Sequence, residues 1–199
     1  MEISPLILKW LTILLRWGHV FFAITWVGNS YLFNYLDNKL KRNIESKEVD
    51  AEGILQHSGY YYRLTRFNGA PKVVPKNLII FKWQSYLTFI TGILLLIVIY
   101  YANSKILMMD DRVNANITPL MGIGISIFSI IGSWLIYDLI CKSKLINYKI
   151  IFPIVLLVTG TIIAFCLTKI YGARFAFLSV GIILGCIMFF NVFFVIIPN

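Results

Sequence analysis

Apolar residues in this chain gather in five uncharged stretches, separated by segments that hold the lysine, arginine and acidic residues. The stretches are residues 17–36, 83–104, 114–137, 150–168 and 175–199. Each is close to the roughly 20 residues that a helix needs to cross a bilayer. Backbone N–H and C=O groups must be hydrogen-bonded internally in lipid, and the chain has no alternating ten-residue strands. The pattern therefore predicts an all-α fold, an integral membrane helical bundle with about five transmembrane helices.

Residues at the membrane interface change the ends of three predicted spans slightly. The spans are then about 10–36, 83–104, 114–140, 150–168 and 175–197, within a single membrane domain over residues 1–199. The composition, 59% apolar and 16% aromatic, leaves little room for a separate water-soluble domain. Membrane lipid is the expected surrounding of most of the chain.

The net charge of +9 is concentrated in two of the connecting loops. Residues 37–82 hold nine lysine and arginine residues, and the loop after the third span holds Lys142, Lys144 and Lys149. Charge placed in this way sets membrane topology, so no nucleic-acid partner is expected. The positive-inside rule places the N-terminus outside, the C-terminus inside and loop 37–82 in the cytoplasm of a multi-pass protein of a bacterial-type inner membrane.

The second half of this cytoplasmic loop, residues 54–63, is too aromatic for a plain linker because it contains three consecutive tyrosines. Two conformations are open from the sequence. One is a short interfacial helix with the tyrosines facing headgroups, and the other is a segment folded back to cap a cavity.

His19 is a titratable residue inside the first span. A polar ring in lipid is costly, so it should face the interior of the bundle and is a candidate functional residue. A neutral imidazole can ligate a metal or a haem iron. The alternative is a histidine hydrogen-bonded to a neighbouring helix. If Arg16 marks the outer boundary, His19 lies about 5 Å deeper, in the outer leaflet.

The other histidine, His57, lies in the loop and is a candidate catalytic acid or base, although a histidine in a surface loop is often inert. At the start of the second span, Lys82, Trp83 and Gln84 offer groups that could bind a planar polyamide or an anion. Interfacial anchoring explains Lys82 and Trp83 equally well.

Two further charges have a structural and a functional interpretation. Arg174, at the start of the fifth span, could meet a haem propionate, or it could simply mark the membrane boundary. Asp138 precedes Lys142 by one helical turn, a spacing that favours a helix salt bridge.

The small residues of the later spans are typical of close helix packing, and glycines that make room for a flat cofactor are the alternative. They include Gly122, Gly124, Gly160, Gly181 and Gly185. The three cysteines form no C-x-x-C-H motif, so covalent attachment of a c-type haem is excluded. The absence of the common nucleotide and hydrolase motifs leaves redox or transport chemistry in the membrane.

Eight short segments, in the same order along nearly the whole chain, resemble the N-terminal membrane domain of the membrane-bound, cytochrome c-linked urate oxidases (urate hydroxylases). They are residues 16–20 (RWGHV), 23–30 (AITWVGNS), 36–38 (LDN), 57–61 (HSGYY), 81–86 (FKWQSY), 98–101 (VIYY), 134–143 (WLIYDLICKS) and 191–199 (NVFFVIIPN). Each match is short, but their order and spacing together are specific.

The resemblance implies a membrane oxidoreductase that oxidises a purine-type substrate and passes electrons towards a c-type cytochrome domain or subunit. It implies His19 as the haem or redox-site ligand, with the haem held non-covalently. It also implies a substrate side formed by His57 together with Lys82, Trp83 and Gln84.

The chain departs from the family pattern in three ways. Ser58 interrupts the glycine run after the loop histidine, Ser179 occupies a position where relatives tend to carry histidine, and relatives continue beyond Asn199 into further helices and a cytochrome domain. Activity is therefore expected to need completion by further helices, a second membrane subunit or another copy. The alternative function is a non-enzymatic membrane module, either a scaffold subunit or a permease-like bundle.

Overall fold

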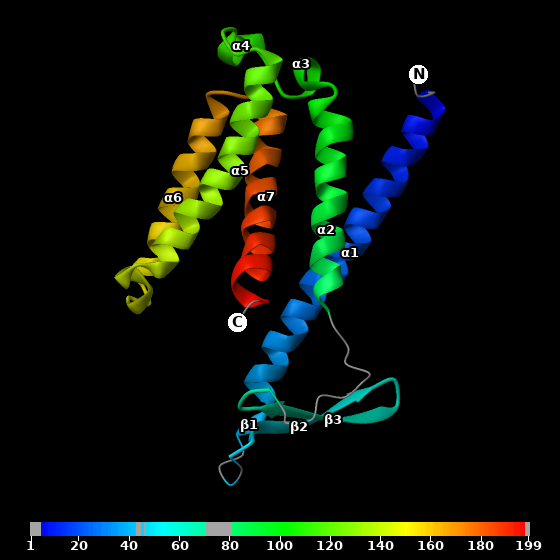
Figure 1. The fold of residues 1–199 in the computed structure, drawn as a ribbon, viewed down its shortest axis with the longest axis vertical. Coiled ribbons are helices and arrows are strands. Elements are labelled where there is room, and N and C mark those ends of the chain that lie inside the picture. Colours follow the sequence, from blue (N-terminus) through cyan, green and yellow to red (C-terminus); the bar gives the residue numbers. More distant parts are fainter. Residues whose placement is uncertain (1–4, 43–44, 46, 71–80, 198–199) are drawn as a thin grey trace. The chain divides into compact units, whose positions relative to one another are not determined.

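The computed structural model describes residues 5–42, 45, 47–70 and 81–197 (Figure 1). The chain divides into two compact units, one formed by residues 1–20 with 85–199 and the other by residues 21–84. The prediction of one membrane domain stays a prediction. Lys72, Lys76 and Asn199 lie outside the described residues.

Helices account for most of the described chain. They are α1 (Pro5–Lys39), α2 (Lys82–Leu95), α3 (Ser104–Leu107), α4 (Asp111–Asn114), α5 (Pro119–Lys142), α6 (Ile151–Thr168) and α7 (Ala173–Asn191). π-Helical turns, Leu96–Tyr101 and Val192–Ile196, continue α2 and α7, and a 3₁₀ turn, Lys144–Asn147, follows α5.

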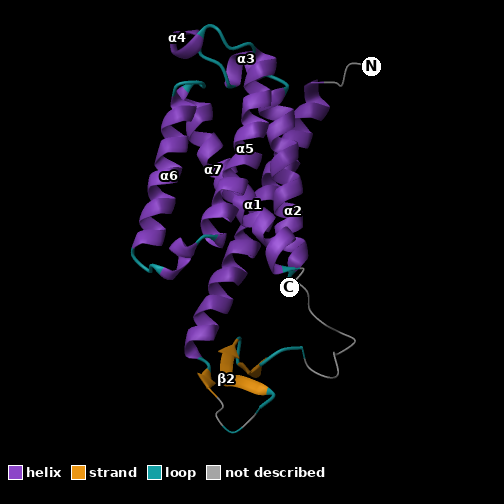
Figure 2. Ribbon diagram, turned by 60° about the vertical axis from the view of Figure 1, so that its left-hand side comes forward, coloured by secondary structure: helices purple, strands orange, loops and turns teal. Residues whose placement is uncertain are grey.

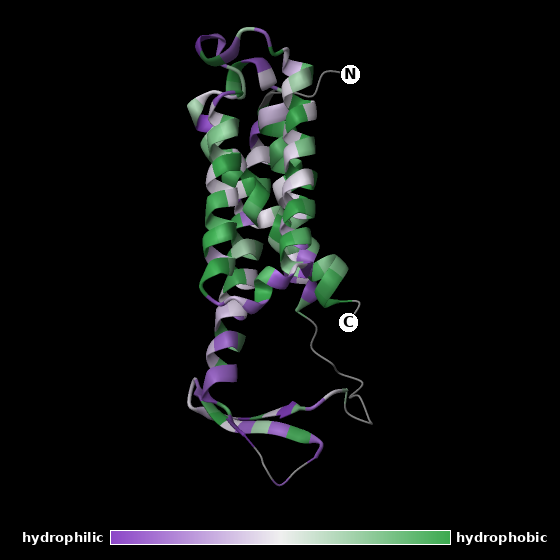
Figure 3. Ribbon diagram, turned by 90° about the vertical axis from the view of Figure 1, so that its left-hand side faces the viewer, coloured by the Kyte–Doolittle hydropathy of each residue, from purple (hydrophilic) through white to green (hydrophobic). Residues whose placement is uncertain are grey.

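Five of these helices are long and apolar enough to cross a membrane: Leu6–Lys39, Lys82–Tyr101, Pro119–Lys142, Ile151–Thr168 and Ala173–Ile196. Figure 3 shows that hydrophobic residues predominate along these helices. The predicted helical membrane bundle is confirmed, with changed boundaries. The third span begins at Pro119 because Thr118 caps α5 by accepting a hydrogen bond from Met121 N–H.

The core of the first unit lies where α7 packs against α5 and α6 (Figure 2). Tyr171 and Phe175 are fully buried there, and the Tyr171 hydroxyl donates a 2.6 Å hydrogen bond to the Gly122 carbonyl. Gly122 has no side chain and so leaves room for Met109, whose methyl carbon would lie 2.5 Å from an added Cβ. Packing thus explains Gly122.

The same explanation is wrong, within this chain, for four other glycines. Among the described residues, an added Cβ would have no neighbour within 4 Å at Gly124, Gly160, Gly181 or Gly185. Several serines, in contrast, are buried between helices, including Ser126, Ser133 and Ser179.

The second unit contains a three-stranded antiparallel sheet in the order β1 (Lys41–Arg42), β2 (Val49–His57) and β3 (Tyr60–Phe67). Of the two conformations left open for residues 54–63, the interfacial helix is wrong because the segment forms a β-hairpin, and the segment that caps a cavity stays untested. Ser58 and Gly59 both have positive φ, at 51° and 81°, which is the type I′ geometry of a two-residue hairpin. The flanking β-branched and aromatic residues suit strands better than a helix.

The sheet packs on the last turn of α1. Ala51 is fully buried and Leu36 nearly so. Gly53 lies against Leu40, whose Cδ2 would be 2.7 Å from a Cβ added at Gly53. A small residue at this point allows the strand to approach the end of the helix closely.

Candidate functional site

His19 lies on α1 and is half-buried against α2. Its Nδ1 is 3.0 Å from the carbonyl oxygen of Thr88 and 3.2 Å from the hydroxyl oxygen of Thr91. On the same face of α2, Gly92 lies beside the imidazole. Positions 88, 91 and 92 share this face because residues three and four apart are neighbours on a helix surface.

The partners of Nδ1 determine the tautomer of the His19 ring. The Thr88 carbonyl can only accept a hydrogen bond. The Thr91 hydroxyl donates its single proton towards the carbonyl oxygens of Leu87, at 2.6 Å, and Thr88, at 3.1 Å. Its oxygen therefore presents a lone pair to the ring, as the Thr88 carbonyl does. The chemistry of these two partners therefore assigns the proton to Nδ1, which donates it. In the neutral ring, Nε2 then holds a lone pair.

No residue in the described part of the chain makes a hydrogen bond to Nε2 of His19, and this atom is not among the fully buried ones. Nδ1 is hydrogen-bonded to a neighbouring helix, as the structural alternative expected. Ligation of a metal or haem iron by Nε2 stays a prediction.

The helix that His19 meets is a candidate membrane span. Gly92, beside the ring, is ten residues after Lys82 and nine before Tyr101, the two ends of the span that contains α2. The outer-leaflet position of His19 stays a prediction.

Lys82, Trp83 and Gln84 form the first turn of α2, within the second unit. Gln84 accepts a 2.7 Å hydrogen bond on Oε1 from the side-chain amide of Asn29. The Lys82 ammonium lies 5.9 Å from the centroid of the Trp83 ring, which is largely exposed. The turn thus presents a cation beside an aromatic face, next to an amide held by α1.

His57 is the last residue of β2, opposite Tyr60 across the two-residue turn. Its side chain is exposed, and no described residue forms a hydrogen bond, ion pair or ring contact with it. The predicted substrate group is thus only partly brought together, because Lys82, Trp83 and Gln84 are consecutive while no contact joins them to His57.

Arg174 is the second residue of α7, and its side chain is exposed. No described residue pairs with it, and no contact joins it to His19. No group of three histidine, cysteine or acidic residues that could hold a metal ion exists in the described ranges. Any ligand at His19 would therefore be held by this imidazole together with groups other than such a cluster.

Sequence reasoning missed the residues that surround His19 and Gln84. Thr88, Thr91, Gly92 and Asn29 lie in apolar stretches and carry no charge. The signal that could have identified the first three is their i, i+3, i+4 spacing, which places polar or small residues on one face of an otherwise apolar helix.

The fold and the site define a class, a multi-pass helical membrane protein with a half-buried imidazole hydrogen-bonded to a neighbouring helix. The family model described as urate oxidase N-terminal matches residues 5–199, almost the whole chain, so this chain belongs to that family. No curated protein and no solved structure matches it.

Proposed function

We propose that this chain is the N-terminal membrane part of a urate-oxidase-like, haem-linked oxidoreductase, which passes electrons from a purine-type substrate towards a c-type cytochrome. The observation that carries the proposal is the state of His19. Its Nδ1 is hydrogen-bonded to the Thr88 carbonyl, and no described residue bonds its Nε2, which lies beside Gly92 of the second candidate span.

The hydrogen bond at Nδ1 of His19 suits ligation of a haem iron by Nε2. Histidines that ligate metals usually donate their other ring N–H to a carbonyl or carboxylate, which fixes the tautomer and the ring orientation. The Thr88 carbonyl has this role here. Haem, when bound, supplies one-electron transfer. Arg174, exposed and without a partner in the described chain, is the candidate contact for a propionate.

The first turn of α2 suits the recognition of a planar anion. The exposed Trp83 ring offers a stacking face, the Lys82 ammonium beside it offers positive charge, and Gln84 offers an amide whose orientation is fixed by Asn29. Urate is planar, anionic and rich in carbonyl and N–H groups, which this combination can bind. His57 would act as an acid or base if the bound substrate comes within its reach.

The test is anaerobic purification in detergent, a pyridine haemochrome assay, and then addition of urate to the oxidised protein. His19→Ala should lose the haem. His57→Ala is the matched control because it removes the chain's only other histidine. It should retain the haem and lose urate-dependent reduction.

Three results would count against parts of the proposal. Colourless protein in all three samples would favour the non-enzymatic membrane module. Bound haem that urate does not reduce would leave electron transfer without this substrate. Haem that persists in His19→Ala would show that His19 is not its ligand.

The proposed orientation has the N-terminus outside and residues 37–82 in the cytoplasm, because this segment carries nine basic residues. A single cysteine in place of Ser58, at the hairpin turn, would report it in a background without the native cysteines. In intact bacterial cells the residue should resist an impermeant thiol reagent, and in opened membranes it should react. Labelling of this cysteine in intact cells would show that the orientation is the reverse of the one proposed.

A further inference from the structure

We propose that Thr88, Thr91 and Gly92 of α2 form a seat that positions His19 and presents its Nε2 outward from α2. The inference deepens the proposed function and rests on it, because the value of a fixed Nε2 lies in ligation at that atom. The seat residues are positioning residues, since they touch the imidazole and no reacting atom.

Gly92 leaves space that the imidazole of His19 occupies. A Cβ added there would lie 2.9 Å from Cε1, 3.4 Å from Nδ1 and 3.8 Å from Nε2 of His19. Carbon atoms do not approach as closely as 2.9 Å, and the obstacle is a rigid ring rather than the end of a flexible chain. Alanine at this position would therefore push the imidazole away from α2.

Two hydrogen-bond acceptors lie at Nδ1 of His19. The Thr88 carbonyl at 3.0 Å and the Thr91 hydroxyl oxygen at 3.2 Å both receive the same N–H. A shared donor of this kind fixes both the rotation of the ring and the proton on Nδ1. The Thr91 hydroxyl can act only as an acceptor because its proton is committed to the Leu87 and Thr88 carbonyls.

The contact of the ring with Gly92 and the hydrogen bonds at Nδ1 together fix the position of the imidazole. Displacement of the ring by a side chain at position 92 would lengthen both hydrogen bonds to Nδ1, and the tautomer would no longer be fixed. Partners of this kind typically change metal affinity by about 10- to 100-fold when they are removed. Gly92 is therefore expected to determine whether Nε2 is available, although it makes no polar contact itself.

The experiment uses ¹⁵N-labelled histidine in the full chain, purified in detergent. The chain has two histidines, so His57→Gln assigns the remaining signals to His19. The wild type should show a protonated Nδ1 and an unprotonated Nε2. Gly92→Ala should show a mixture of tautomers. Gly181→Ala is the matched control, since an added Cβ meets nothing within 4 Å there, and it should keep the wild-type signals.

Thr91→Val removes one acceptor while the shape of the side chain is retained, so it tests the seat even if Gly92→Ala does not fold. Its Nδ1 signal should shift, and any bound haem should be held up to about tenfold less tightly. The proposal is overturned if wild-type His19 carries its proton on Nε2. It is also overturned if Gly92→Ala, or Thr91→Val where the former is unfolded, keeps the wild-type signals.

The two proposals fail in different ways. Protein without haem that still shows the Nδ1–H tautomer contradicts the proposed function and leaves the seat intact. Protein that binds haem through His19 while Gly92→Ala has no effect on ring or haem contradicts the seat alone.

Discussion

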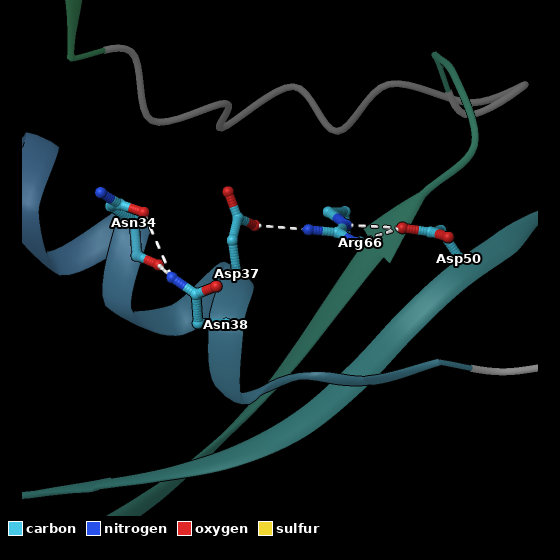
Figure 4. Close-up of polar contacts among 5 residues, drawn as sticks. All are labelled: Asn34, Asp37, Asn38, Asp50 and Arg66. Atoms are coloured by element: carbon cyan, nitrogen blue, oxygen red, sulfur yellow. Dashed lines mark hydrogen bonds and ion pairs between the residues drawn. The ribbon is translucent and has the colours of Figure 1, made fainter. Parts of the chain in front are cut away.

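Arg66 on β3 is joined to Asp37 in the last turn of α1 by a 2.8 Å hydrogen-bonded ion pair (Figure 4). The same guanidinium binds Asp50 on β2, with a 2.7 Å hydrogen bond from Nε. One side chain therefore connects a helix to two strands. These hydrogen bonds with Asp37 and Asp50 raise the pKa of Arg66.

Arg66→Met should loosen the sheet from the end of α1. The aliphatic part of the side chain is kept, but both carboxylates lose their partner, so amide hydrogen exchange in β1 and β2 should accelerate. Arg63→Met is the control, because Arg63 pairs at 3.0 Å with Glu52 inside the hairpin and makes no bond to α1. Equal exchange rates in the two variants would show that Arg66 has no special role in the attachment.

Two substitutions in the hairpin turn should change the stability of the hairpin in opposite directions. Gly59 has φ of +81°, so Gly59→Ala should destabilise the hairpin by about 1 kcal/mol. Ser58 has φ of 51°, and Ser58→Asn should stabilise the hairpin because asparagine tolerates this conformation better. Gly69→Ala, without a positive φ and with open space around the added carbon, should change little. Hydrogen exchange of β2 and β3 amides measures all three changes.

Asp110 caps the short helix α4, and its carboxylate accepts hydrogen bonds from Arg112 N–H at 3.0 Å and from the Arg112 guanidinium at 2.9 and 3.0 Å. These bonds lower the pKa of Asp110 below its ordinary value of 3.8. A lowered pKa in the folded state means that the carboxylate stabilises the turn above the unfolded pKa, and that this contribution is lost as pH falls through the folded pKa. The cap should therefore persist at pH 3.8 and open only as pH falls through the lowered pKa of the folded state.

The carboxyl ¹³C shift of Asp110 measures this titration directly. Arg112→Gln should move its midpoint upward towards 3.8, because the guanidinium hydrogen bond is the largest cause of the lowered pKa. An unchanged midpoint in Arg112→Gln would contradict this assignment.

The membrane helices could be predicted because the length, the hydropathy and the absence of charge are properties of each segment alone. The ion pair between Asp138 and Lys142, at 2.6 Å, was predicted for the same reason and is confirmed. The hairpin was missed, although Ser58 and Gly59 lie between two runs of strand-forming residues, because the tyrosines also suit a membrane interface.

The environment of His19 could not be predicted, because Thr88 lies 69 residues further along the chain and Thr91 lies 72. Nothing in the local pattern of α1 specifies which face of α2 it meets. The sequence identified the ring as unusual in lipid, and only the packing of the two helices determined which of its nitrogens is hydrogen-bonded.

Tyr171 provides a test of the core, through its 2.6 Å hydrogen bond to the Gly122 carbonyl in the first turn of α5. Tyr171→Phe keeps the ring, which packs edge-on against Phe175 with centroids 4.9 Å apart, and removes only the donor. The loss should cost about 1 kcal/mol, the net contribution of a typical hydrogen bond, and should lower the unfolding temperature in detergent. Tyr148→Phe is the control, because its side chain is exposed and no described residue bonds its hydroxyl. If both variants unfold at the same temperature as the wild type, the connection between Tyr171 and α5 contributes nothing measurable to the stability of this bundle.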